Sequence, residues 1–340
     1  MGACKRESIA VASRLRWRSP MTRFGYHVSH EQHPPSALLR YVCAAEATGF
    51  SGAMSADHFH PWLEENGQSG FAWSWLGAAL HATSCSIGVV TAPGDRYHPA
   101  IIAQAAATLA EMFPGRFWIA LGSGEALNEH VTGNDWPSKD VRNERLRECA
   151  DVMRPLWRGE TVTHRGRVVV EDAKLYSRPE QPPRLLGAAV SEETAEWVAS
   201  WADGLITTGR RRDEMRSMIE AFHRAGGTGK PIVVQHVLSW APKIDDARRA
   251  AHEQWRFATL PGDRLWDLRM PHDFAAATRD ASIDVVTAKI PTSSSLAEHA
   301  EELRVYSELG VDEVYIHNVG LNQLESIEAF GREVLPFLSS

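Results

Sequence analysis

A short segment of the chain gathers four side chains that can do chemistry. Asp57, His58, His60 and Trp62 place a carboxylate, two imidazoles and an indole within six residues. The segment directly follows the short apolar run 52–54, so it is predicted to lie where a strand ends in a loop. A strand end that delivers acid/base groups and a flat aromatic surface together indicates a redox or acid/base site. The alternative is a polar, aromatic loop without catalytic function.

The elements that must position these residues alternate between strand and helix. From residue 21 onward, short apolar runs are followed by segments with helical spacing, such as 34–48 and 99–112. Eight such repeats predict one α/β domain over residues 21–340, a (β/α)8 TIM barrel, interrupted by a hairpin over 161–176. The predicted strands are 23–28, 52–55, 86–91, 116–121, 185–189, 204–207, 232–240 and 313–317.

One part of the chain departs from this alternation. Helices are evident in residues 242–291 but strand breaks are not, which predicts an insertion after the seventh strand, in a position to cover the barrel mouth. The competing fold is a doubly wound sheet, which needs a glycine-rich fingerprint after an early strand. The segment 27–32 after the first strand contains no glycine, so the barrel is favoured.

Titratable and polar side chains recur at the predicted strand ends. Chemistry in a barrel gathers at the C-terminal ends of its strands, and a structural barrel does not need so many titratable groups there. Their concentration favours an enzyme over a binding or scaffold protein. The candidates are His27, His30, Glu31, Asp57, His58, Trp62, Thr91, Pro93, Ser123, Glu125, Asn128, Thr207, Thr208, Arg210, Arg211, Arg212, His317 and Asn318.

Composition narrows the class of protein. The net charge of −7 argues against nucleic-acid binding, and no apolar run is long enough to span a membrane. The four cysteines are widely spaced, as in buried thiols of a reducing compartment, which predicts a cytoplasmic protein. Residues 1–20 are basic and lack the apolar core of a secretory signal. They are predicted to be an extension that is disordered or not native.

Two hydrolytic chemistries compete with a redox site. His58 and His60 form an HxH pair at a strand end, as in metal-dependent barrel hydrolases, but ligands from later strands are not evident. We therefore predict no metal site and keep the metallohydrolase as the alternative function. Ser123 lacks the GxSxG pattern of a serine hydrolase nucleophile.

Four segments together carry a resemblance to a known family. They are 25–32 (GYHVSHEQ), 57–62 (DHFHPW), 96–100 (RYHPA) and 122–129 (GSGEALNE). In this combination the chain resembles the bacterial luciferase-like flavin oxidoreductases from about residue 21 to its C-terminus. It is most similar to the subgroup around the dehydrogenases that use the deazaflavin coenzyme F420 and oxidise glucose 6-phosphate.

The resemblance implies roles for the catalytic residues. It implies that His58 acts as base or proton relay beside the flavin and that Asp57 contacts the flavin or orients His58. Trp62 would cap the substrate or stabilise an intermediate, Glu125 would be the acid opposite His58, and Glu31 would lie in the substrate pocket. Each has a structural alternative: a loop histidine bonded to a carbonyl for His58, core packing for Trp62, and a first-turn carboxylate facing the helix dipole for Glu125.

The resemblance also implies where the cofactor and the substrate bind. In the family the third strand often carries a non-prolyl cis peptide under the flavin, and Val89–Val90 is the matching pair. The expected cofactor-binding residues are Asp57, Val89, Val90, Gly122, Ser123, Gly124, Asn128, Gly187, Ala188 and Ser191. The expected substrate-binding residues are Thr208, Arg210 and Arg211.

Two departures from the family pattern bear on which substrate and which cofactor are expected. Arg210 and Arg211 stand where a phosphate-binding lysine is expected, and Leu265 and Ala288 align near the other two anchors, which argues against glucose 6-phosphate. After the fifth strand, Glu192 and Glu193 would repel the polyglutamyl tail of F420 if they face it. The sequence therefore favours FMN, with F420 as the alternative.

The predicted activity is hydride transfer or monooxygenation of a small organic substrate. The predicted assembly is a homodimer.

Overall fold

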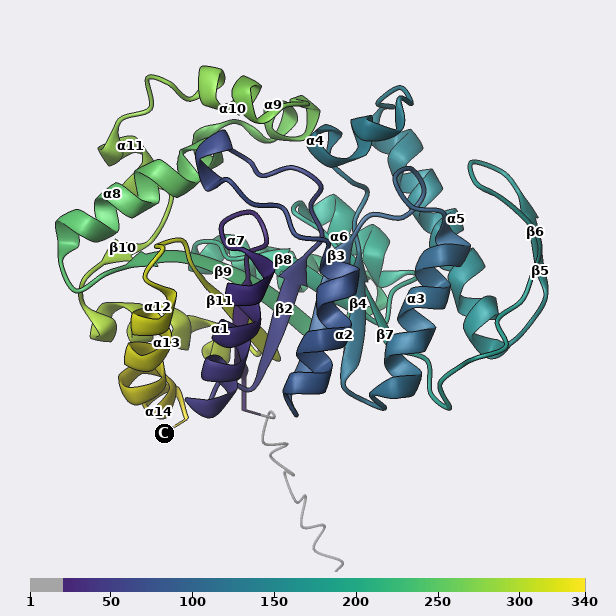
Figure 1. Ribbon diagram of the computed structural model, residues 1–340, viewed down its shortest axis with the longest axis horizontal. Coiled ribbons are helices and arrows are strands. Elements are labelled where there is room, and N and C mark those ends of the chain that lie inside the picture. The colour runs from purple at the N-terminus through teal and green to yellow at the C-terminus, as the bar shows by residue number, and fades with distance from the viewer. Residues whose placement is uncertain (1–20, 340) are drawn as a thin grey trace, which may run out of the picture.

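The structure is a computed structural model that describes residues 21–339 (Figure 1). The predicted extension, residues 1–20, lies outside these residues. Eight parallel strands form the barrel, and their bounds agree with the predicted ones to within one residue at each end. These strands are β1 (Arg23–Val28), β2 (Gly52–Ala56), β3 (Ser86–Thr91), β4 (Phe117–Leu121), β7 (Arg184–Ala188), β8 (Gly204–Thr208), β9 (Ile232–Trp240) and β11 (Glu313–Asn318).

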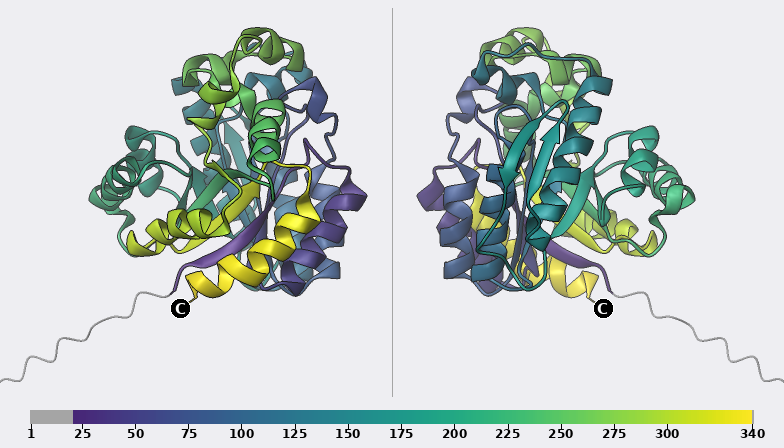
Figure 2. Two further views of the ribbon diagram at one scale, coloured as in Figure 1. Left: turned by 90° about the vertical axis from the view of Figure 1, so that its left-hand side faces the viewer. Right: turned by 90° about the vertical axis from the view of Figure 1, so that its right-hand side faces the viewer.

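The sheet closes on itself. Its order runs β9-β11-β1-β2-β3-β4-β7-β8, and β8 also pairs in parallel with β9, with Leu205 opposite Ile232. A ninth strand, β10 (Thr292–Ser293), adds to β9 outside the barrel. The predicted hairpin is β5 (Val162–Arg165) and β6 (Val169–Ala173), which lies on the outside of the molecule (Figures 1 and 2). The predicted (β/α)8 barrel is thus confirmed.

Helices surround the barrel and extend it at one end. They are α1 (Pro35–Ala47), α2 (Ala72–Ala82), α3 (Pro99–Met112), α4 (Ala126–Glu129), α5 (Lys139–Arg158), α6 (Glu192–Ala199), α7 (Arg212–Phe222), α8 (Ile244–Trp255), α9 (Gly262–Asp267), α10 (Pro271–Ala277), α11 (Ile283–Thr287), α12 (Leu296–Glu308), α13 (Gln323–Ala329) and α14 (Leu335–Leu338). Helix α12, which leads into the last barrel strand, is not among the elements that the sequence predicts.

Large side chains fill the lower part of the barrel. Trp118 and Tyr315 point inward and pack against Met54, Leu186 and other buried residues. A Cβ atom at position 88 would lie 1.9 Å from the Trp118 indole, so only glycine at Gly88 leaves room for that ring. The barrel is therefore plugged below its mouth, and the chemistry is confined to the end where the strands finish.

The predicted insertion lies over that end. Helices α8 to α11 follow β9 and lie above the strands, with α9 beside α4 (Figure 1), and the side views agree (Figure 2). Phe257, Phe274 and Val286 of this segment share a buried apolar cluster with Trp62 and Leu127 of the barrel loops. Burial of these side chains fixes the insertion on the mouth rather than leaving it as a loose loop.

Candidate active site

Three strand ends bring a histidine and two carboxylates together at the mouth. His58 follows β2, Glu31 follows β1, and Glu125 follows β4. The Nε2 atom of His58 lies 3.5 Å from Glu31 Oε1 and 3.9 Å from Glu125 Oε2. The His58 side chain is only 11% exposed, so these groups interact with little screening by water. This arrangement can move a proton between an imidazole and a carboxylate.

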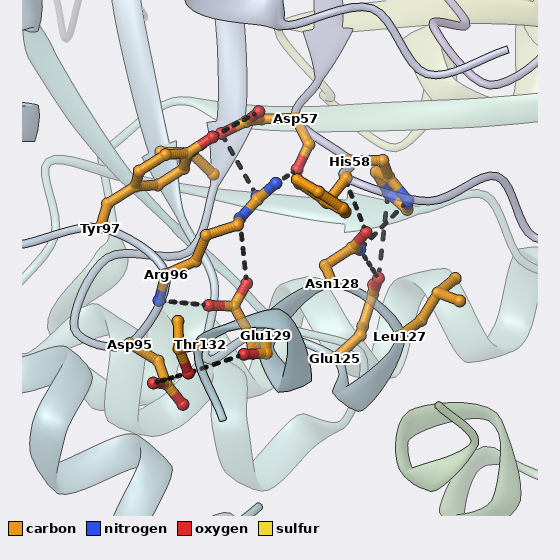
Figure 3. Close-up of polar contacts among 12 residues, drawn as sticks. Asp57, His58, Asp95, Arg96, Tyr97, Glu125, Leu127, Asn128, Glu129 and Thr132 are labelled. Atoms are coloured by element: carbon orange, nitrogen blue, oxygen red, sulfur yellow. Dashed lines mark hydrogen bonds and ion pairs between the residues drawn. The ribbon is translucent and has the colours of Figure 1, made fainter. Parts of the chain in front are cut away.

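Asn128 holds His58 and Glu125 in place (Figure 3). Its Nδ2 atom donates to Glu125 Oε2 at 3.0 Å and lies 3.2 Å from His58 Nδ1. Its Oδ1 atom accepts from the backbone N–H groups of Phe59 at 2.8 Å and His60 at 3.2 Å. The resemblance implies a cofactor contact for Asn128, but the structure shows it tying the His58 loop to α4.

Burial gives Glu125 the character of an acid. It is the largest influence and raises the pKa of Glu125, and the neighbouring Glu31 raises it further. His58, Arg96 and the hydrogen bond from Asn128 act in the opposite direction. The carboxyl group therefore keeps its proton to a higher pH than an exposed glutamate does. Glu31 is itself buried and accepts a hydrogen bond from Ser29 Oγ at 3.1 Å.

Asp57 is bound away from His58. Thr91 Oγ1 donates to Asp57 Oδ2 at 2.9 Å, the Tyr97 hydroxyl donates to Oδ1 at 3.2 Å, and Arg96 Nη2 lies 3.4 Å from Oδ2. Between Asp57 and His58 no hydrogen bond occurs in residues 21–339. In this structure Asn128, rather than Asp57, orients the imidazole.

Arg96 links Asp57 to α4. Its Nη2 atom donates to the Asp57 carbonyl oxygen at 2.8 Å, and its Nε atom lies 3.6 Å from Glu129 Oε1. Its backbone N–H donates to Glu129 Oε2 at 2.8 Å (Figure 3). Burial raises the pKa of Glu129 to about 7, and Arg96 acts against that shift. Sequence reasoning noted Arg96 only as part of the RYHPA motif, because its partners are distant in the chain.

Trp62 forms an aromatic wall with the insertion. Its ring lies 5.3 Å from the His58 ring and stacks on Phe257 at 4.7 Å, with Phe274 edge-on at 5.4 Å. Trp62 thus packs in an apolar cluster and also lies beside His58, and its contact with the substrate stays a prediction. His60 faces elsewhere, since its Nδ1 atom lies 2.9 Å from the Leu127 carbonyl and its ring stacks on His130.

The two histidines of the HxH pair thus face different groups. His58 faces Glu31 and Glu125, and His60 faces the Leu127 carbonyl. No group of three or more His, Cys, Asp or Glu side chains in the described part of the chain has an arrangement that could hold a metal ion.

A second layer of polar residues lies next to Glu31. The rings of His27 and His317 stack at 4.3 Å, and His317 Nε2 lies 2.9 Å from Gln32 Oε1. Burial lowers the pKa of His27 well below its usual value and that of His317 to about 3, so both rings are neutral. Gln32 also donates to Gln254 Oε1 at 3.0 Å, which joins the first strand end to α8. Nothing in the sequence around Gln254 indicates this contact.

Small residues line the mouth at the ends of β3, β4 and β7. Val90 and Ala188 point into the barrel and are only partly buried, and Thr208 is exposed. A Cβ atom at Gly122 would lie 3.8 Å from the Ala188 Cβ, so nothing large stands between these two strand ends. A flat tricyclic ring fits a surface of this kind. FMN or F420 would supply an acceptor for hydride there, with Val90, Gly122, Ser123, Gly124 and Ala188 as its floor.

Two predicted cofactor positions point elsewhere. Val89 belongs to the cluster between barrel and helices, and a Cβ at Gly187 would lie 2.5 Å from Val198 in α6. Side chains alternate along a strand, so Val89 and Val90 necessarily face opposite sides. The expected cis peptide between them is wrong, because residues 21–339 contain no cis peptide bond.

The predicted arginine cluster is likewise divided. Arg210 donates from Nη2 to the Val190 carbonyl oxygen, Arg212 Nη1 lies 2.7 Å from Glu308 Oε2, and Arg211 is exposed. Burial lowers the pKa of Arg210, with Glu214 acting against the shift.

At the start of α6, Ser191 Oγ accepts from the Thr194 backbone N–H at 3.3 Å. Ser191 is thus the helix cap there.

Comparison with known proteins places this site in a family. The luciferase-like monooxygenase family matches residues 20–313. The chain is 32% identical to an F420-dependent glucose-6-phosphate dehydrogenase of Microbacterium testaceum, over 93% of this chain and 97% of that protein. It is 33% identical to a protein of the same name from Segniliparus rotundus, over 94% of this chain and 98% of that one.

A solved structure is similar over the whole barrel. An F420-dependent secondary alcohol dehydrogenase, in complex with an F420-acetone adduct, superimposes with a TM-score of 0.86 at 30% identity. The match covers 94% of this chain and 99% of that one. The oxidoreductase is therefore favoured over the metallohydrolase. The chain belongs to the luciferase-like monooxygenase family and is an oxidoreductase.

Proposed function

We propose that this protein is a dehydrogenase that uses coenzyme F420 to move a hydride to or from a small, uncharged alcohol or ketone. The observation that carries the proposal is the placement of His58 between Glu31 and Glu125 at the barrel mouth. Hydride transfer at a carbinol carbon also needs a group that handles the hydroxyl proton, and these three side chains are suited to it.

F420 is preferred to FMN for two reasons. The relatives named above and the superimposed alcohol dehydrogenase are described as F420-dependent. Moreover, Glu192 and Glu193, which favour FMN in the sequence, are both exposed in the first turn of α6. Their charges act through water and are strongly screened, so they do not exclude an anionic tail.

An uncharged substrate is favoured by the residues near the aromatic wall. Leu265 packs against the cluster around Trp62, and Ala288 carries no charge. Arg264 and Arg269, the other candidates for a phosphate anchor in this segment, are exposed. Arg210 is already bonded to the Val190 carbonyl oxygen. A buried phosphate would lack the paired arginine or lysine donors that it needs.

The proposal is tested by binding and turnover together. Purified protein is titrated with F420 and, separately, with FMN, and the cofactor spectrum is followed. The F420 complex is then offered glucose 6-phosphate and a series of uncharged secondary alcohols. We expect tighter binding of F420 and turnover with the alcohols only. Tight binding of FMN with oxygen-dependent turnover would instead support a monooxygenase, and turnover of glucose 6-phosphate would contradict the uncharged substrate.

A further inference from the structure

The amide group of Asn128 has no spare hydrogen-bonding capacity. Its two lone pairs accept from Phe59 and His60 N–H, at 2.8 and 3.2 Å. Its two hydrogens face Glu125 Oε2 at 3.0 Å and His58 Nδ1 at 3.2 Å. An asparagine can make four such contacts, and Asn128 makes all of them while only 4% exposed.

The two contacts with backbone N–H groups fix which way the amide points. If the group turned over, its NH2 would face two N–H groups that can only donate. Each buried polar group left without a partner costs about 1–3 kcal/mol. The orientation with the nitrogen toward His58 is therefore strongly preferred. His58 Nδ1 faces a group that only donates, so it must accept.

We propose that Asn128 is a positioning residue that keeps the neutral His58 ring in the tautomer with its hydrogen on Nε2. A neutral imidazole carries one hydrogen, and the bond made by one ring nitrogen decides the state of the other. The Nε2–H group then points toward Glu31 Oε1 and Glu125 Oε2, 3.5 and 3.9 Å away. His58 meets the substrate as a hydrogen-bond donor.

The chemical consequence rests on the function proposed above, although the tautomer itself does not. When an alcohol is oxidised, bound F420 would supply the acceptor for the carbinol hydride, and the hydroxyl proton would pass to the Glu31 carboxylate. The C–O bond gains double-bond character while His58 Nε2–H stays bonded to that oxygen. Two electrons, one hydride and one proton are accounted for, and the reverse steps reduce a ketone.

The tautomer can be measured directly. Protein labelled with 15N-histidine is studied by NMR at a pH where His58 is neutral, and the His58 signals are identified by their loss in His58→Gln. We expect the hydrogen on Nε2 in the native protein. A hydrogen on Nδ1 would overturn the proposal, and this measurement needs neither cofactor nor turnover. A protein that shows the expected tautomer but does not turn over with F420 would refute only the proposed function.

Two variants test whether Asn128 is the cause. In Asn128→Asp a carboxylate oxygen replaces the donor, so the hydrogen should move to Nδ1 and kcat should fall by about 10²-fold with little change in KM. In Asn128→Ala both tautomers should be populated. Asn143→Asp, on α5 away from the site, is the matched control and should change neither the His58 tautomer nor kcat. An unchanged His58 tautomer in both Asn128 variants would show that another group sets it.

Discussion

We expect turnover to depend most on His58. Its loss removes the group closest to both carboxylates but leaves the small-residue floor intact. We expect His58→Ala to lower kcat by about 10²-fold or more while the dissociation constant of the cofactor changes by less than about tenfold. His60→Ala is the control, because His60 bonds to the Leu127 carbonyl instead. Equal losses in the two variants would assign His58 a structural role.

Glu125 should set an alkaline limit of activity, because its neutral form leaves the His58 Nε2–H group, 3.9 Å away, to bond the substrate oxygen. Burial raises the pKa of its carboxyl, so the protonated acid persists above the usual range and is lost as the pH rises through the raised pKa. Activity that needs the acid is present below that pKa and falls above it. In Glu125→Gln the alkaline limb of the kcat profile should disappear. A limb that stays at the same pH in this variant would belong to another group.

At the scale of elements, the sequence predicts the barrel strands well because each is a short apolar run between breaks. It does not predict α12, because this polar helix follows an insertion in which strands and helices no longer alternate. It places His58, Glu125 and Glu31 at strand ends, and the structure brings them together. It does not foresee that Asn128 reaches His58, seventy residues away, because such a contact depends on how two loops fold over the mouth.

Arg96 joins its own loop to the loop after β2 and to α4. We therefore expect it to contribute to the free energy of unfolding. Its side chain is 7% exposed and pairs with the buried carboxylates of Asp57 and Glu129. Arg96→Met leaves both carboxylates without their cation, so we expect the free energy of unfolding to fall by about 3–5 kcal/mol, and by less in Arg96→Lys. Denaturant unfolding measures this change.

The matched control for Arg96 is an exposed pair. Arg165 and Glu171 lie 3.1 Å apart on the hairpin, both more than half exposed. Arg165→Met should cost less than about 1 kcal/mol. If Arg96→Met lowers the free energy of unfolding by no more than Arg165→Met does, Arg96 does not hold the loops together.

At the scale of the whole molecule, the packed interior of the barrel stabilises the fold that carries the site. Gly88→Ala would force a Cβ to within 1.9 Å of the Trp118 ring, so we expect a loss of about 3 kcal/mol or more in unfolding free energy. Gly77→Ala makes the same change in α2, where the added Cβ would lie 3.9 Å from Leu109 Cδ2. It should be neutral or stabilising by up to about 1 kcal/mol. Similar losses in both would contradict this account of the barrel interior.

The fold of the whole molecule also explains how the insertion and the barrel share the site. Trp62 belongs to a barrel loop but stacks on Phe257 of the insertion, so the aromatic wall exists only when both are folded. Residues 21–339 contain no helix long and apolar enough to cross a membrane. The homodimer and the cytoplasmic location stay predictions from the sequence.

The proposed activity is hydride transfer between an uncharged alcohol and F420. The direct measurement uses a secondary alcohol with deuterium at its carbinol carbon, mixed with the protein and oxidised F420 without oxygen. We expect the visible absorbance of oxidised F420 to be lost, one deuterium to appear in the reduced cofactor, and the alcohol to be recovered as a ketone. Unchanged F420, or reduced F420 without deuterium, would contradict the claim.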